Sequence, residues 1–295
     1  WHPGRADHVR AIPHMPSRKF HIRTDMEGVS GVVNLHQVTP GSDEYQQARE
    51  WYMAELLALV EGLLEGGATD VSIYDEHWFG RNVDVARLPA GVRVLAGKPP
   101  YRADWAGGLD RTHAGMILHG LHSMAGTGEV LCHTYEPDFA AIALNGRQVG
   151  EIGVETAIAG DAGVPLVLVC ADSAGLAEAR ALVPGVPGVV TKISQSATGA
   201  ECRALVDVVR DLREAGRQVA AALPPVAVFA VRGPVRLDCT FVEGAYLDVL
   251  RERQAGSFVR RDTLRLTAPT VTAAWADYWQ MKLAVQAELA RRARA

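Results

Sequence analysis

Short apolar segments alternate with longer helical segments along most of the chain, and this order limits the possible folds more than any other feature. The clearest apolar segment, residues 164–170, is apolar at nearly every position, as in a strand covered on both faces. Strands that alternate with helices form α/β folds, because each helix brings the chain back for another parallel strand. We therefore predict an α/β fold with a largely parallel central sheet and flanking helices, followed by a smaller α+β portion.

The individual elements follow from hydrophobic periodicity and from turn residues. Strands are predicted at residues 20–24, 71–74, 92–95, 116–118, 130–133, 139–144, 164–170, 189–193, 226–231 and 264–268. Helices are predicted from an N-cap at Ser42 to Gly66, at residues 150–162, 174–183 and 199–223, and from residue 271 to the C-terminus. Asn145–Gly146 is expected to turn the chain after the strand at 139–144.

Charge, hydropathy and cysteine usage exclude several classes of protein. The 30 Lys and Arg residues against 34 Asp and Glu residues give a formal net charge of −4. There is no basic excess to neutralise nucleic-acid phosphates or an anionic membrane surface, so neither partner is expected. No apolar run is long enough for a transmembrane helix. The four cysteines are far apart and three have apolar neighbours, which indicates reduced, buried thiols in a cytoplasmic protein.

Carboxylates and imidazoles directly follow three of the predicted strands. Asp25 and Glu27 come after the first strand, His77 after the second, and His122 after the strand at 116–118. The carboxyl ends of parallel strands meet at one edge of a sheet, where α/β proteins bind their ligands. Carboxylates combined with imidazoles suit zinc, manganese or iron better than calcium. The sequence therefore predicts a transition-metal site at this edge.

Two details bear on how many ions the site holds. Asp25 and Glu27 are two positions apart, which places both carboxylates on the same side of an extended chain, where one could bridge two ions. Gly28 would then allow the backbone to leave this crowded place with any φ. Glu151 lies between two glycines in the first turn of an apolar helix. It is either a further ligand or an acid stabilised by the helix dipole.

The residues at these positions resemble a known family. The run at 25–31, Asp-Met-Glu-Gly-Val-Ser-Gly, is similar to the opening motif of the DppA-type D-aminopeptidases, zinc peptidases from a bacterial dipeptide-transport operon. The similarity continues, in order, at residues 75–77, 120–122, 132–134, 145–153 and 191–197, and it covers about residues 19–290. The sequence departs from the family pattern at Glu76, Trp78 and Phe79, where smaller polar residues are expected.

The resemblance implies two zinc ions per subunit, with manganese, cobalt or iron as alternatives. The implied metal ligands are Asp25, Glu27, His77, His122 and Glu151. Asp25 would bridge the ions, with Glu27 and His77 on one and His122 and Glu151 on the other. The family's additional catalytic histidine corresponds to His133. Because the family forms rings, the resemblance also implies a homo-oligomer, with a decamer by analogy.

The chemistry of these side chains agrees with amide hydrolysis. The pKa range of a histidine such as His133 suits the transfer of a proton to the leaving nitrogen. Glu76 and Glu155 are the next acids to consider for that step. Asp75, two residues before His77, is a candidate for orienting the imidazole, or else an ordinary solvated aspartate at a strand end.

We therefore predict a dizinc aminopeptidase that hydrolyses short peptides or amino-acid amides. Its preference for an N-terminal D-residue is implied by the resemblance alone. Two alternatives stay open: a metal-dependent amidase or phosphoesterase of other specificity, and a non-catalytic, metal-dependent peptide-binding protein. A binding protein has no need of a proton shuttle, so the role of His133 distinguishes it from an enzyme.

The chain is predicted to have three parts. Residues 1–14 are taken as an extension before a native start at Met15, so His2, His8 and His14 are left out of the site. Residues 15–223 form the metal-binding α/β catalytic domain. Residues 224–295, which begin at a Pro-Pro pair, form a smaller α+β portion that mediates oligomerisation or completes the pocket.

Overall fold

The computed structural model describes residues 18–294, so the predicted extension at 1–14 and the start at Met15 lie outside the described residues. A six-stranded sheet of order β3-β2-β1-β4-β7-β8 forms the centre, and all its neighbouring strands are parallel. Its strands are β1 (Lys19–Thr24), β2 (Asp70–Asp75), β3 (Val92–Leu95), β4 (Gly115–Leu121), β7 (Leu166–Ala171) and β8 (Gly188–Val190). The strand order reverses between β1 and β4, and such a switch point is where α/β sheets bind ligands.

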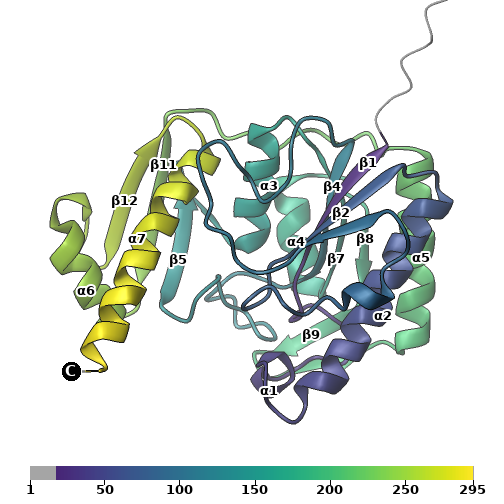
Figure 1. The fold of residues 1–295 in the computed structure, drawn as a ribbon, viewed down its shortest axis with the longest axis horizontal. Helices are drawn as coiled ribbons and strands as arrows, with labels where there is room; N and C mark the ends of the chain where they lie inside the picture. The colour runs from purple at the N-terminus through teal and green to yellow at the C-terminus, as the bar shows by residue number, and fades with distance from the viewer. Residues whose placement is uncertain (1–17, 295) are drawn as a thin grey trace, which may run out of the picture.

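Helices cover both faces of this sheet (Figure 1). On one face, α2 (Tyr45–Glu65) packs against α5 (Leu205–Ala221), and the two share a core with Phe20 and Ile22 of β1. On the other face lie α3 (Glu151–Asp161) and α4 (Ser173–Leu182). Because side chains alternate along a strand, His21 and Arg23 face the α3 side.

A second, antiparallel sheet stands beside the first, with order β12-β11-β5-β6 (Figure 1). Its strands are β5 (Phe139–Leu144), β6 (Arg147–Val149), β11 (Val235–Phe241) and β12 (Thr263–Ala268). The helices α6 (Ala245–Gln254) and α7 (Val271–Arg292) pack on it through an aromatic core that includes Phe139, Trp275 and Tyr278. Two of its strands precede residue 224 and two follow it, and the predicted domain boundary there stays a prediction.

The predicted α/β architecture is confirmed, with local corrections. Residues 130–133 form a turn followed by irregular backbone and not a strand, and Leu131 has a positive φ of 52°. The strand predicted at 189–193 is divided between β8 and β9 (Lys192–Ser196). The helix predicted at 199–223 begins only at residue 205, because β10 (Gly199–Cys202) pairs with β9. The segment at 226–231 is not a strand; its backbone passes against Gly160 of α3.

The remaining elements were not predicted or begin elsewhere. The strands β6 and β11 and the helix α6 were missed. So were the short helices α1 (Leu35–Val38), η1 (Val85–Arg87) and η2 (Ala255–Ser257). The helix α2 begins at residue 45, since the Ser42 hydroxyl donates to the carbonyl of His36 and does not cap the helix. The turn at Asn145–Gly146 is confirmed, with φ of 50° and 86° between β5 and β6.

Two expectations about composition can also be compared with the structure. Within residues 18–294, no helix is both long and apolar enough to cross a membrane. All four cysteines are free thiols. Cys170 and Cys239 are buried as expected, but Cys132 is only half-buried and Cys202 is exposed.

Candidate metal centre

Asp25 and Glu27 lie on the turn that follows β1, and this turn touches the end of β4 backbone to backbone. The Gly28 N–H donates to the Gly120 carbonyl at 2.7 Å, and a Cβ added to Gly28 would lie 2.0 Å from the Leu121 carbonyl oxygen. The expectation that Gly28 provides freedom in φ is wrong, since its φ lies outside the left-handed range. Glycine is required there by the close approach of the two chains.

A buried lysine, Lys192, also fixes the backbone of this turn. The Lys192 ammonium donates to the carbonyls of Glu27, Val29 and Val32, the last two at 2.9 and 2.5 Å. Burial lowers the pKa of Lys192 to about 8. Lys192 thus fixes the backbone that carries Glu27.

The first cluster joins this turn to the end of β2. The His77 Nδ1 lies 2.8 Å from Oδ1 of Asp25 and 3.1 Å from Oε2 of Glu27. The opposite ring nitrogen, Nε2, donates to the Val38 carbonyl at 2.6 Å. That bond leaves the lone pair on Nδ1 facing two carboxylates, an arrangement that calls for a cation between them.

The second cluster repeats this pattern at the end of β4. The His122 Nδ1 donates to the Ser123 carbonyl at 3.0 Å, which leaves the lone pair on Nε2. The Nε2 atom is buried without a hydrogen-bond partner, 3.5 Å from Oδ2 of Asp25 and 3.4 Å from Oε1 of Glu151. Glu151 is the first residue of α3, and its position beside His122 is suitable for a ligand in this cluster.

Asp25 connects the two clusters, because its Oδ1 faces His77 and its Oδ2 faces His122. Two ligands about 2.0–2.2 Å from a tetrahedral zinc ion lie roughly 3.3 Å from each other. The separations of 2.8–3.5 Å across the two clusters are close to that value. The donor set and its spacing therefore fit two ions of the zinc type, one in each cluster.

Electrostatics show the same excess of negative charge. Burial disfavours the charged imidazole of His77, but Glu27 and Asp25 outweigh it and raise its pKa well above the usual range. Burial acts in the same way on His122, and the carboxylates of Asp25 and Glu151 again raise the pKa. Burial alone would raise the pKa of Asp25 and Glu151, but the adjacent imidazoles lower both. Each cluster is thus built to attract positive charge.

His133 lies at the outer edge of the second cluster. Its ring stacks on that of His122 at 4.2 Å, and its Nε2 is 3.7 Å from Oε1 of Glu151. Its Nδ1 donates to the Leu131 carbonyl at 2.9 Å, so Nε2 is the basic nitrogen. The side chain is 32% exposed. It was expected at the end of a buried strand, but it stands on a turn, close enough to His122 and Glu151 to join them on an ion.

The other acids singled out in the sequence are already bonded elsewhere. Asp75 accepts hydrogen bonds from Asn82 and Val83 and does not contact the His77 ring, whose orienting partner is a backbone carbonyl. Glu76 and Glu155 both accept from the buried guanidinium of Arg23. Arg23 was missed, although a charged residue inside an otherwise apolar strand is a recognisable signal.

Two exposed aromatic side chains follow His77 directly. Trp78 and Phe79 are 49% and 60% exposed, with ring centroids 5.7 Å apart. Trp78 has a φ of 49°, which is strained for a bulky residue. Phe79 also lines a hollow beside Tyr45 and Asn82, and Asn82 donates to the His77 carbonyl. This hollow adjoins the metal centre on the His77 side.

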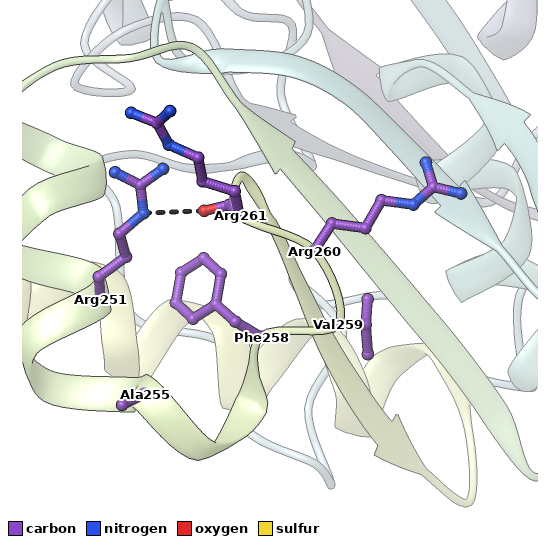
Figure 2. Close-up of a pocket in the computed structure, with 6 residues that line it drawn as sticks. All are labelled: Arg251, Ala255, Phe258, Val259, Arg260 and Arg261. Atoms are coloured by element: carbon purple, nitrogen blue, oxygen red, sulfur yellow. Dashed lines mark hydrogen bonds between the residues drawn. The ribbon is translucent and has the colours of Figure 1, made fainter.

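A second hollow lies in the antiparallel part and contains no site residue (Figure 2). Its lining includes Phe258 and three arginines. Arg251 donates to the Arg261 carbonyl, and both arginines pair with Glu243. This hollow offers neither metal ligands nor a nucleophile.

Comparisons with known proteins agree with the fold and identify the family. A model of the D-aminopeptidase family, peptidase family M55, matches residues 19–278. The D-aminopeptidase of Bacillus subtilis (strain 168) is 29% identical over 186 residues, which are 62% of this chain and 67% of that relative. A solved structure, described as the Zn-dependent D-aminopeptidase DppA from Bacillus subtilis, a self-compartmentalizing protease, covers 91% of this chain and 98% of its own. Its TM-score is 0.84 at 23% identity, which establishes the shared fold. Since the family model spans most of its length, the chain belongs to the D-aminopeptidase family of peptidases.

Proposed function

We propose that the protein is a dizinc aminopeptidase that removes an N-terminal D-residue from short peptides or amino-acid amides. The observation that carries this proposal is the geometry of Asp25, whose two carboxylate oxygens each face the basic nitrogen of a different imidazole. Glu27 completes one cluster and Glu151 the other. Family membership favours a peptidase over the phosphoesterase and the non-catalytic binding protein.

The chain's own residues would divide the chemistry between them. Zinc ions, when bound, polarise the substrate carbonyl and activate a water molecule as the nucleophile. The His133 side chain is partly exposed at the edge of the site and its Nε2 carries the lone pair, so it takes up a proton and delivers it to the leaving nitrogen. Glu155 is fully engaged by Arg23 and Tyr135, which leaves His133 as the better shuttle.

Substrate selection is assigned to the rim beside His77. Trp78 and Phe79 stand where the sequence departs from the family pattern, and Phe79 lines the adjoining hollow. We assign to them contact with the substrate side chain, and therefore the preference between D- and L-residues. Their exposure is explained by such a role, since large exposed aromatic pairs mark binding sites.

We also propose a cytoplasmic homo-oligomer. Four free thiols suit a reducing compartment. The structural neighbour is described as self-compartmentalizing, and a ring decamer is the corresponding proposal for this chain.

Metal analysis and a chirality assay test the proposal together. The purified protein should contain two transition-metal ions per chain and should cut D-alanyl nitroanilide faster than L-alanyl nitroanilide. A chelator should abolish both activities, and added zinc should restore them. No metal and no rebinding would refute the metal centre, whereas equal rates would refute only the D-preference.

A further inference from the structure

We propose that Tyr135 is a positioning residue for His133. It connects the turn that carries His133 to the helix α3 through two hydrogen bonds. The inference rests on the proposed function, because it assigns the proton shuttle to His133. It adds Tyr135, Glu155 and Arg23, which lie outside the metal clusters and form a polar network behind them.

Tyr135 binds two successive turns of α3 with two different groups. Its backbone N–H donates to Oε1 of Glu151 at 2.6 Å, and its hydroxyl donates to Oε1 of Glu155 at 2.6 Å. Glu151 and Glu155 are four residues apart, so they lie on the same face of the helix. The two bonds fix both the position and the direction of Tyr135 relative to α3.

Glu155, which accepts from the Tyr135 hydroxyl, is itself held by a buried ion pair. The second oxygen of Glu155 accepts from Nη1 of Arg23, a fully buried residue of β1. The same guanidinium donates to Tyr101 at 2.7 Å and to the Ala106 carbonyl at 2.6 Å. Both carboxylate oxygens of Glu155 are therefore occupied, and its orientation is set by the central sheet.

The turn that carries His133 needs such an anchor. Leu131 and Tyr135, two residues before and two after His133, both have positive φ, at 52° and 57°. That conformation costs a non-glycine residue free energy, and it persists only where other contacts impose it. On the Tyr135 side those contacts are the two glutamates and the ring of Trp275, 4.6 Å away on α7. Without the hydroxyl bond the turn can relax, and the His133 ring would leave its stacked position on His122.

The variant Tyr135→Phe removes only the hydroxyl and keeps the ring and the backbone bond to Glu151. We expect kcat to fall about 10–100-fold, as for other groups that orient an active-site side chain, with little change in KM or in metal content. The matched control is Tyr246→Phe, which removes another buried tyrosine hydroxyl, bonded to Tyr278 at 3.1 Å in the antiparallel part. The control should keep full activity.

A double-mutant cycle separates positioning from a general structural role. In a His133→Ala background, Tyr135→Phe should cause no further loss, because the residue it positions is gone. An equal loss of activity in both backgrounds, or a loss of metal, would overturn the inference. Glu155→Gln is the second variant: it keeps the shape of the side chain but weakens the bond to Arg23, and it should reproduce the loss in the parent only.

The outcomes distinguish this inference from the function on which it rests. A parent protein without turnover of aminoacyl nitroanilides would refute the proposed function. An active parent that is sensitive to His133→Ala but unaffected by both Tyr135→Phe and Glu155→Gln would refute only the role of Tyr135.

Discussion

The two candidate metal clusters combine the same kinds of ligand, carboxylates and imidazoles, but differ in how firmly the structure holds them. We call the first cluster the inner cluster and the second the outer cluster. In the inner cluster, Asp25, Glu27 and His77 are all buried and follow the ends of two adjacent strands, β1 and β2. In the outer cluster, His122 is buried, but Glu151 begins a helix and His133 stands on a strained turn with 32% of its side chain exposed. All three residues of the inner cluster thus directly follow strands of the sheet, whereas the outer cluster also depends on the turn that carries His133.

This difference indicates a division of labour. A rigid, enclosed cluster suits permanent binding of an ion. A cluster with an exposed imidazole at its edge can admit substrate and exchange protons with solvent. Asp25 belongs to both clusters, so the binding of both ions, and with it turnover, should depend on this residue.

The largest effect is expected from Asp25→Asn. An amide cannot supply two anionic oxygens, so both clusters lose a ligand, and turnover should fall to background. Elemental analysis should show fewer than two ions per chain. The matched control is Asp238→Asn on β11, which breaks a pair with Arg265 outside the site and should leave activity intact. An Asp25→Asn protein that keeps two ions would contradict the bridging role.

The next effect separates a ligand from a proton shuttle. His133→Ala should lower kcat by about 10²–10⁴, the usual size of an acid–base contribution, and should keep both metal ions. His77→Ala should lose metal as well as activity. If His133→Ala releases an ion, then His133 is a third ligand of the outer cluster and the comparison between the clusters must be redrawn.

The comparison also predicts the order of metal loss. With excess chromophoric chelator, release should occur in two phases, with the ion of the outer cluster leaving first because that cluster is the more exposed. His122→Ala should remove the fast phase and His77→Ala the slow one. Simultaneous release of both ions would show that the clusters behave as one unit.

The smallest effect concerns the rim. Trp78→Ser should change the ratio of kcat/KM for D- and L-alanyl substrates by about 10-fold, a typical consequence of losing apolar pocket contacts. Metal content should not change. Val85→Ser removes another exposed apolar side chain, in η1, and serves as the control. An unchanged ratio would show that Trp78 does not contact the substrate.

The sequence was sufficient to predict the parallel sheet and the residues that follow its strands, because its strands are either apolar runs, as in β7, or alternate apolar with polar residues, as in β1. It was not sufficient for the groups that orient the imidazoles. His77, His122 and His133 are oriented by the backbone carbonyls of Val38, Ser123 and Leu131. Because every residue has a backbone carbonyl, the sequence does not indicate which one orients a given imidazole.

Other errors have identifiable physical causes. β11 was missed although Val235, Leu237 and Cys239 alternate with polar residues, so its signal was present in the pattern. The residues at 130–133 look like a strand because they are apolar. Their conformation is decided by tertiary contacts, including the bond from Tyr135 to Glu151 across 16 residues.

The contact between Gly28 and Gly120 has a consequence for protein engineering. A Cβ on either residue would lie 2.0 Å from a backbone oxygen of the other segment, so neither position tolerates a side chain. A mutational library aimed at new selectivity should therefore leave both glycines unchanged. The useful diversity lies at the exposed residues 78–79, which can be randomised while the inner scaffold is left untouched.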